Sequence, residues 1–238
     1  MIVLFSPAKT FKTTKQKTEQ KPFFMTKTLH LAQIIKTYTL NDIQKHFHVS
    51  DHIASDVYTY YHTFNQTLYP AVDLYDGTSY KALDVGSFSK EERNFLNQHV
   101  YIISALYGLL KPLDMISKYR LDFYHKSLGN LYTYWKDDLN QYLFKNHKND
   151  LKISLLSKEF EKVIDAKKNP YIQIDFYIRE NDRLKSPSMM LKKTRGLFLN
   201  HIIKKQLKTI DDIKALTVDG YRYHNSESTN HRLVFIKD

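Results

Sequence analysis

The chain has 238 residues, of which 42% are hydrophobic and 14% aromatic, so it is long and apolar enough to bury a sizeable core. Its formal net charge of +11 is typical of a protein that binds a polyanion, although a lysine-rich proteome produces the same value. It contains no cysteine, which excludes disulfides, a thiol nucleophile and a thiol peroxide sensor.

No stretch of the sequence approaches the roughly 18 apolar residues that a membrane span requires. Met1–Phe5 is too short for the core of a signal peptide and has no basic region before it. We therefore expect a cytoplasmic protein with no membrane partner. No linker, repeat or low-complexity segment interrupts the chain, so we expect a single domain over residues 1–238 and a monomer.

The first predicted element is a strand over Ile2–Phe5, a continuous apolar run typical of a strand buried on both faces. It ends in Ser6-Pro-Ala-Lys-Thr10, and ligands of open α/β sheets lie beyond the carboxyl ends of strands. Ser6 and Thr10 can donate hydrogen bonds to phosphate oxygens, and Lys9 can supply a charge. The segment lacks the glycines of a Walker motif, and a polar turn without a ligand is the alternative.

Helical spacing of apolar residues next predicts helices over residues 31–38, 41–47 and 51–64, after an exposed lysine-rich loop. Three histidines lie in this region, at His46, His48 and His52. Their spacing matches no zinc pattern and no carboxylate motif completes it, so we predict neither a metal site nor a cofactor there.

The middle of the chain carries the most unusual stretch. Leu74–Gly77 is expected to be a short strand, and the capping box Ser89-x-x-Glu92 predicts the start of a helix. An apolar run then leads to Tyr107-Gly108, which Lys111-Pro112 and a basic tail with Lys118 and Arg120 follow. This order predicts a helix-hairpin-helix-like nucleic-acid contact. A tight strand-to-helix turn with a packing glycine is the alternative, since the usual hairpin carries two glycines.

The second half begins with predicted strands over Leu151–Leu156, which ends in the polar group Ser157–Glu159, and over Tyr171–Tyr177. Leu184–Leu191 is irregular around Pro187 and is expected to end in a short strand at Met189-Met190. A long helix follows from Lys192, and a pair of strands ends the chain.

That long helix has a predicted inner stripe of Leu199, Ile202, Ile203 and Gln206, and Arg195 lies on the same side. An arginine beside an apolar stripe is paired with a carboxylate or lines a cleft, and Glu159 and Asp114 are the candidate partners. From Arg183 to Ile210 there are eight basic residues and no acidic one, a clustering that favours a polyanion partner.

Five ordered motifs make the chain resemble the YaaA family of bacterial peroxide-stress proteins: Ser6–Thr10, Leu106–Asp114, Tyr119–Leu121, Leu131-Tyr with Trp135, and Lys192–Leu197. The resemblance covers essentially the whole chain. It implies a compact mixed α/β domain, binding to double-stranded DNA and a role in limiting iron-driven damage. It supplies no established reaction.

Together these observations predict an α/β (mixed α+β) domain, with a mixed sheet flanked by helices and a helix-hairpin-helix-like element around Gly108. The expected function is binding of double-stranded DNA in the peroxide stress response. The expected DNA- or phosphate-binding residues are Ser6, Lys9, Thr10, Tyr107, Gly108, Lys111, Lys118, Arg120, Lys192, Lys193 and Arg195.

Two other functions remain open at this point. The chain is alternatively an enzyme that acts on a nucleotide or nucleobase, with Lys9 as nucleophile or phosphate ligand, Glu159 as general acid or base and Arg195 as a clamp. That function requires an enclosed pocket that holds both Lys9 and Glu159. The third option is a basic scaffold whose charge serves only solubility.

Overall fold

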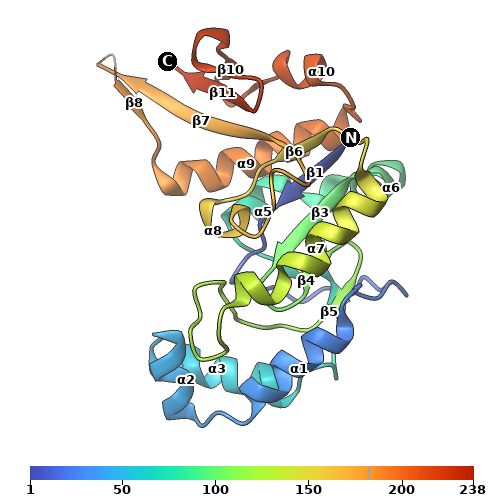
Figure 1. Cartoon of the computed structure of the whole chain (residues 1–238), viewed down its shortest axis with the longest axis vertical. Coiled ribbons are helices and arrows are strands. Elements are labelled where there is room, and N and C mark those ends of the chain that lie inside the picture. The colour runs from blue at the N-terminus through green and yellow to red at the C-terminus, as the bar shows by residue number, and fades with distance from the viewer. Residues whose placement is uncertain (182) are drawn as a thin grey trace.

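The computed structural model describes residues 1–181 and 183–238 of the chain (Figure 1). A nine-stranded mixed sheet forms its centre. The strands of this sheet are β1 (Ile2–Phe5), β3 (Val100–Ser104), β4 (Gly108–Leu110), β6 (Lys152–Ser154), β7 (Ile172–Glu180), β8 (Arg183–Lys185), β9 (Thr217–Val218), β10 (Tyr221–Tyr223) and β11 (Arg232–Lys237). They run in the order β4-β3-β1-β6-β7-β11-β10-β9, and β8 pairs with β7. The predicted α/β class is confirmed.

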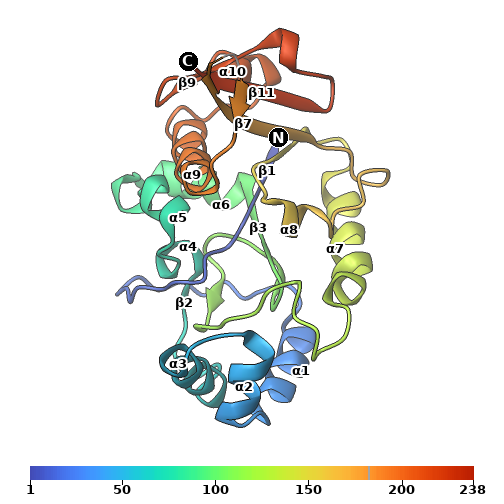
Figure 2. The same ribbon diagram turned by 90° about the vertical axis from the view of Figure 1, so that its left-hand side faces the viewer.

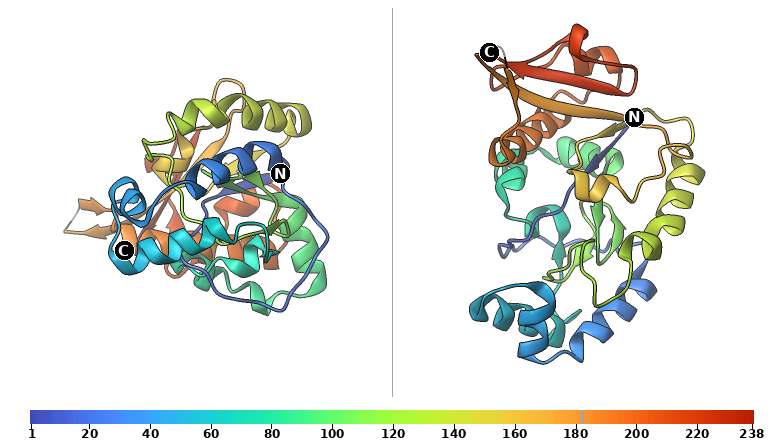
Figure 3. Two further views of the ribbon diagram at one scale, coloured as in Figure 1. Left: turned by 90° about the horizontal axis from the view of Figure 1, so that it is seen from below. Right: turned by 60° about the vertical axis from the view of Figure 1, so that its left-hand side comes forward.

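The helices are α1 (Met25–Lys36), α2 (Leu40–Phe47), α3 (Asp51–His62), α4 (Ala71–Leu74), α5 (Thr78–Leu83), α6 (Lys90–His99), α7 (Leu131–His147), α8 (Lys158–Glu161), α9 (Ser188–Lys204) and α10 (Ile210–Lys214). Figure 2 shows α5, α6 and α9 on one side of β1 and β3, and α7 on the other. Helices α1–α3 gather at one end of the molecule, and β9–β11 lie at the opposite end (Figure 3). A separate two-stranded sheet pairs β2 (Tyr69–Pro70) with β5 (Met115–Ile116).

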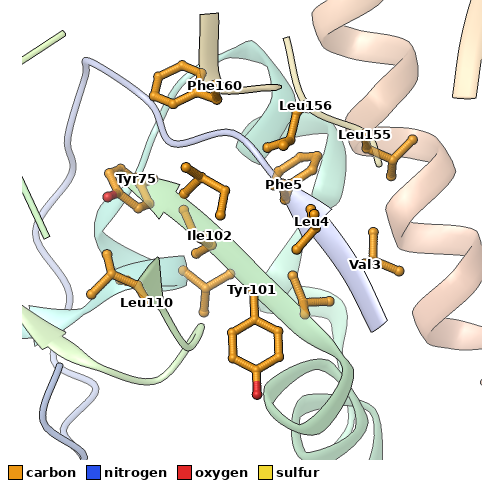
Figure 4. Packing of buried hydrophobic residues seen from close by; sticks show 14 of the residues in the cluster. Val3, Leu4, Phe5, Tyr75, Tyr101, Ile102, Leu110, Leu155, Leu156 and Phe160 are labelled. Atoms are coloured by element: carbon orange, nitrogen blue, oxygen red, sulfur yellow. The ribbon is translucent and has the colours of Figure 1, made fainter. Parts of the chain in front are cut away.

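Strand β1 is the centre of the core, as its apolar run predicts. All four of its residues are buried, and it pairs in parallel with β3 on one side and β6 on the other. Val3 stands opposite Val100 in β3 and opposite Ile153 in β6. Figure 4 shows side chains from β1, β3 and the residues after β6 packed against one another. Removal of this apolar surface from water is the main force that holds the three strands together.

The segment around Gly108 is a β-hairpin, so the prediction of a helix-hairpin-helix-like element is wrong. Helix α6 begins at the predicted capping box but ends at His99, and the chain passes directly into β3. Strands β3 and β4 then pair antiparallel, with Ser104 opposite Gly108. The run Val100–Ser104 is rich in β-branched residues, which fit the pleated, fully buried position beside β1 better than a helix.

Gly108 is needed for packing. Its φ is +70°, a conformation that glycine adopts without steric cost. A Cβ at this position would lie 2.6 Å from Cε3 of Trp135, the tryptophan of α7. The indole Nε1–H of Trp135 donates a hydrogen bond of 2.8 Å to the carbonyl of Ala105 in the same hairpin. The hairpin and α7 therefore pack directly against each other at Gly108.

Three smaller predictions are also corrected. Leu74–Gly77 is not a strand, because Leu74 closes α4 and Tyr75 makes only an isolated bridge to Phe11. Met189-Met190 lies within α9, which begins directly after Pro187. Proline is tolerated at the start of a helix because the first N–H groups there have no partner within the helix. Gln206 falls beyond the end of α9 with a φ of +49° and is exposed.

We expect Gly108→Ala to lower the free energy of unfolding by about 2–4 kcal/mol, because a Cβ here meets both an unfavourable φ and the Trp135 ring. Urea denaturation measures the loss. Gly129→Ala is the matched control, since Gly129 has a φ of +76° but no atom within 4 Å of an added Cβ. Gly129→Ala should lower the free energy of unfolding by only about 1–2 kcal/mol, the cost of placing a residue with a Cβ at a positive φ. Equal losses in both variants would contradict a packing role for Gly108.

Candidate functional site

A cavity of about 490 Å³ lies beyond the carboxyl ends of β1 and β6. Its size falls within the range of small-molecule sites. Segments far apart in the sequence form its walls: the loop after β1, the start of α5, the segment 119–122, the residues after β6, and α9. The lining residues that carry polar or charged groups include Ser6, Lys9, Thr10, Asp76, Thr78, Ser79, Lys81, Tyr119, Arg120, Asp122, Ser157, Glu159, Lys192 and Arg195.

Parallel pairing brings the two polar strand ends together. Leu4 stands opposite Ser154, and the N–H of Leu155 donates to the carbonyl of Leu4. One step further, the N–H of Ser157 donates a 3.0 Å hydrogen bond to Oγ of Ser6. The loop after β1 and the residues after β6 therefore open onto the same space, as expected where two parallel strands end at one edge of a sheet.

One wall of the cavity carries two carboxylates and a lysine. Nζ of Lys9 lies 2.8 Å from Oδ2 of Asp122, and Oε1 of Glu159 accepts a 2.9 Å hydrogen bond from the N–H of Phe123. Burial and the nearby charge of Asp122 raise the pKa of Glu159, while Lys9 opposes the shift. Such a carboxyl group can exchange a proton nearer to neutral pH than an exposed glutamate can.

A second part of the lining is cationic and depends on close packing between α5 and α9. A Cβ on Gly196 would lie 2.0 Å from the carbonyl oxygen of Ser79 and 2.9 Å from Cβ of Ala82, so only glycine permits this approach. It brings Lys192 and Arg195 of α9 to the cavity. Within the described residues Arg195 forms no ion pair with Glu159 or Asp114, the two expected partners. Asp114 accepts hydrogen bonds from Lys111 N–H and Gln20 instead.

Buried tyrosines form the floor of the cavity. The hydroxyl of Tyr119 lies 2.8 Å from Oγ of Ser104 and 2.8 Å from the hydroxyl of Tyr75. Burial raises the pKa of Tyr119 to about 12, so it is protonated and neutral at physiological pH. Tyr80, also buried, donates to the carbonyl of Ser6 and fixes the loop after β1. Tyr119 and Tyr80 therefore give the cavity an uncharged part of its lining, held in place by hydrogen bonds.

The structure brings together six of the predicted binding residues around the cavity: Ser6, Lys9, Thr10, Arg120, Lys192 and Arg195. The others, Tyr107, Gly108, Lys111, Lys118 and Lys193, lie outside its lining. Tyr107 is buried and accepts from Ser117 N–H, and the Lys111 amine donates to the carbonyls of Asn97 and Gln98. Nζ of Lys193 lies 3.8 Å from Asp219.

Sequence reasoning missed several lining residues. Asp122 follows Tyr119-Arg-Leu121 directly, so this motif offered a signal for it, whereas Thr78, Ser79 and Lys81 belong to a short helix with no recognisable pattern. Among the described residues, no group of three metal-binding side chains gathers, at His46, His48 and His52 or elsewhere. No described helix combines the length and apolar character needed to cross a membrane.

The structure is that of an α/β protein with a polar, partly cationic cavity beyond the carboxyl ends of parallel strands. The family described as peroxide stress protein YaaA matches residues 1–227. A UPF0246 protein of Fusobacterium nucleatum is 32% identical over 100% of this chain and 99% of its own length. A second, from Finegoldia magna, is 33% identical over 100% and 98%. The chain belongs to the peroxide stress protein YaaA (UPF0246) family.

We expect the pKa of Glu159 to fall in Asp122→Asn, which removes a neighbouring negative charge, and to rise in Lys9→Met, which removes a positive one. Titration of the Glu159 carboxyl carbon by NMR measures both shifts. Asp76→Asn is the control, because Asp76 lines the cavity but pairs with Lys81. A Glu159 pKa unchanged in both variants would contradict the proposed arrangement of charges.

The same shift has a consequence for stability. Because the folded-state pKa of Glu159 lies above its ordinary value of 4.5, the folded protein binds this proton more tightly than the unfolded chain does. The contribution of Glu159 to the free energy of unfolding is therefore full below pH 4.5 and declines as pH rises through the folded-state pKa. In Asp122→Asn this decline should be smaller, because the folded-state pKa of Glu159 is raised less. Urea denaturation at a series of pH values measures the decline.

Proposed function

We propose that the chain acts in the peroxide stress response by binding double-stranded DNA through lysine and arginine side chains that line the cavity. The observation that carries this proposal is the convergence of Lys9, Arg120 and Lys192 from three distant segments of the chain. Lysine and arginine neutralise backbone phosphates without reading the base sequence, so the binding is largely sequence-independent. The buried hairpin around Gly108 has no part in this contact.

The surrounding surface supports the proposal. Lys12, Lys15, Lys17 and Lys21 are exposed on the loop that follows Lys9, and the chain as a whole carries a formal charge of +11. A charge of this sign attracts a polyanion over distances of about 8 Å at physiological salt. DNA covered in this way would be less accessible to iron-driven oxidation, which connects binding with the stress response of the family.

Two adjacent lysines of α9 provide a direct test. Lys192 lines the cavity, whereas Lys193 lies near Asp219 outside it. We expect Lys192→Ala to weaken binding to a labelled duplex, because one phosphate contact is lost, and to reduce the slope of log affinity against log salt by about 1. Fluorescence anisotropy across a salt series measures both quantities.

Lys193→Ala is the matched control, since it removes the same charge from the same helix. Its affinity and salt slope should stay close to those of the wild-type protein. Equal losses of affinity in the two variants would mean that binding depends only on the total charge of the protein and not on the cavity. No retention of wild-type protein on DNA at physiological salt would overturn the proposal and favour a basic scaffold.

The cavity wall also favours a second function, an enzyme that acts on a nucleotide or nucleobase. The observation behind it is that Lys9, Asp122 and Glu159 share one partly enclosed space with Arg195, the arrangement that such an enzyme requires. Glu159, with its raised pKa, would act as general acid or base, and Lys9 as a ligand or nucleophile.

We expect Glu159→Gln to abolish conversion of a nucleotide substrate while leaving its binding nearly unchanged, because the amide has the shape of the carboxyl but exchanges no proton. Incubation with a panel of nucleotides and duplexes containing oxidised bases, followed by mass spectrometry, measures conversion. Glu161→Gln is the control, since the Glu161 carboxylate accepts from the Tyr171 hydroxyl and does not line the cavity. A wild-type protein that converts none of these compounds would count against the enzyme.

A further inference from the structure

Arg195 is the one described arginine whose buried nitrogen lacks a partner. Its Nε is inaccessible to solvent and forms no hydrogen bond, and the described residues offer no carboxylate within ion-pair distance of its guanidinium. Burial accordingly lowers the pKa of this group. Because arginine stays charged at any physiological pH, the protein holds a partly desolvated positive charge at the wall of the cavity.

The two acidic residues whose charges act on Arg195 do not pair with it, since neither carboxylate lies within ion-pair distance of its guanidinium. Asp175 and Glu161 act on it through their charges. However, Oδ2 of Asp175 accepts a 2.6 Å hydrogen bond from Arg232, and Oε1 of Glu161 accepts from Tyr171.

Arg93 provides the contrast within the same molecule. It is also largely buried, but both of its terminal nitrogens donate to the carboxylate of Asp73, as is usual for a buried arginine. An unpaired buried charge destabilises the folded protein, so a site that retains one is arranged for a ligand that supplies the opposite charge.

The surroundings of Arg195 indicate what that ligand is. Lys192 stands one helical turn earlier on α9, and Thr78 and Ser79 of α5 offer hydroxyl groups across the Gly196 contact. Two cations beside several hydrogen-bond donors match a phosphate group, whose oxygens the planar guanidinium can bind in pairs. The carboxylates Asp122 and Glu159 lie near Lys9, and their charges do not affect the pKa of Arg195.

We infer that Arg195, with Lys192, forms a phosphate-binding subsite that takes the phosphate of a nucleotide. The rest of the nucleotide then extends toward Lys9, Asp122 and Glu159 across the cavity. The nucleotide identity rests on the proposed function, whereas the phosphate subsite follows from Arg195 itself. The same phosphate chemistry can come from a free nucleotide or from the DNA backbone, and the experiment separates these two sources.

The experiment compares the wild-type protein with Arg195→Met, which keeps the unbranched side chain as far as the position of Nε and removes the charged guanidinium. Isothermal titration is performed with inorganic phosphate, deoxyadenosine 5′-monophosphate, deoxyadenosine and a duplex without terminal phosphates. We expect the wild-type protein to bind phosphate and the monophosphate but not the nucleoside. Arg195→Met should weaken monophosphate binding about tenfold or more, because a charge-assisted hydrogen-bond pair is lost.

Thermal unfolding without ligand supplies a second, independent readout. Because Arg195 has no partner among the described residues, Arg195→Met should unfold at the same temperature as the wild-type protein or higher, whereas Arg93→Met should unfold at a lower temperature because Asp73 is left unpaired. Arg179→Met is the surface control, since Arg179 pairs only with the exposed Asp238. A fall in unfolding temperature for Arg195→Met as large as that for Arg93→Met would overturn the inference.

The remaining outcomes distinguish the subsite from DNA binding. If the wild-type protein binds the duplex but neither phosphate nor the monophosphate, the subsite is wrong and the DNA-binding proposal stands. Binding of phosphate and the monophosphate without the duplex supports the subsite and rejects DNA binding. Binding of the duplex that Arg195→Met weakens in parallel with the monophosphate supports a subsite that accepts the DNA backbone.

Discussion

The parallel pairing of β1 with β3 and β6 is the constraint on which the rest of the structure depends. The four residues of β1 are buried on both faces of the sheet, so this strand can occupy only the middle of the sheet. Once β1 and β6 lie side by side, the polar residues that follow them must meet, and the hydrogen bond from Ser157 to Ser6 joins them. The cavity lies at this junction.

Two glycines then decide how the helices close around the sheet. Gly108 admits the Trp135 ring and fastens α7 to the hairpin, while Gly196 lets α9 approach the backbone of α5 and brings Arg195 to the cavity. The motifs that carry the family likeness therefore have two different physical roles. Those around Gly108 serve packing, whereas those at Ser6–Thr10 and Lys192–Leu197 contribute side chains to the cavity, and the peroxide-stress family assignment rests on both.

Much of the local structure was predictable because its causes are local. The Ser89 capping box starts α6 as predicted, and the apolar run Ile2–Phe5 forms a buried strand. The pairing of Val100–Ser104 was not predictable, because a short apolar run fits a buried helix or a buried strand equally well and its partner β1 lies almost 100 residues earlier. Helix α9 begins at Ser188 and not at the predicted Lys192, because the proline that indicates an irregular segment is also compatible with a helix N-terminus.

By itself, the sequence determined the α/β class, the buried first strand, the polar strand ends and the basic character of the chain. These depend on composition and on the order of residues along short segments. Only the tertiary structure decided that Lys9, Asp122 and Glu159 line one cavity, that Arg195 lines it too without a partner among the described residues, and that Gly108 is buried. Those relations join residues that are distant in the sequence, and the burial that fixes them exists only when the sheet and its helices pack together.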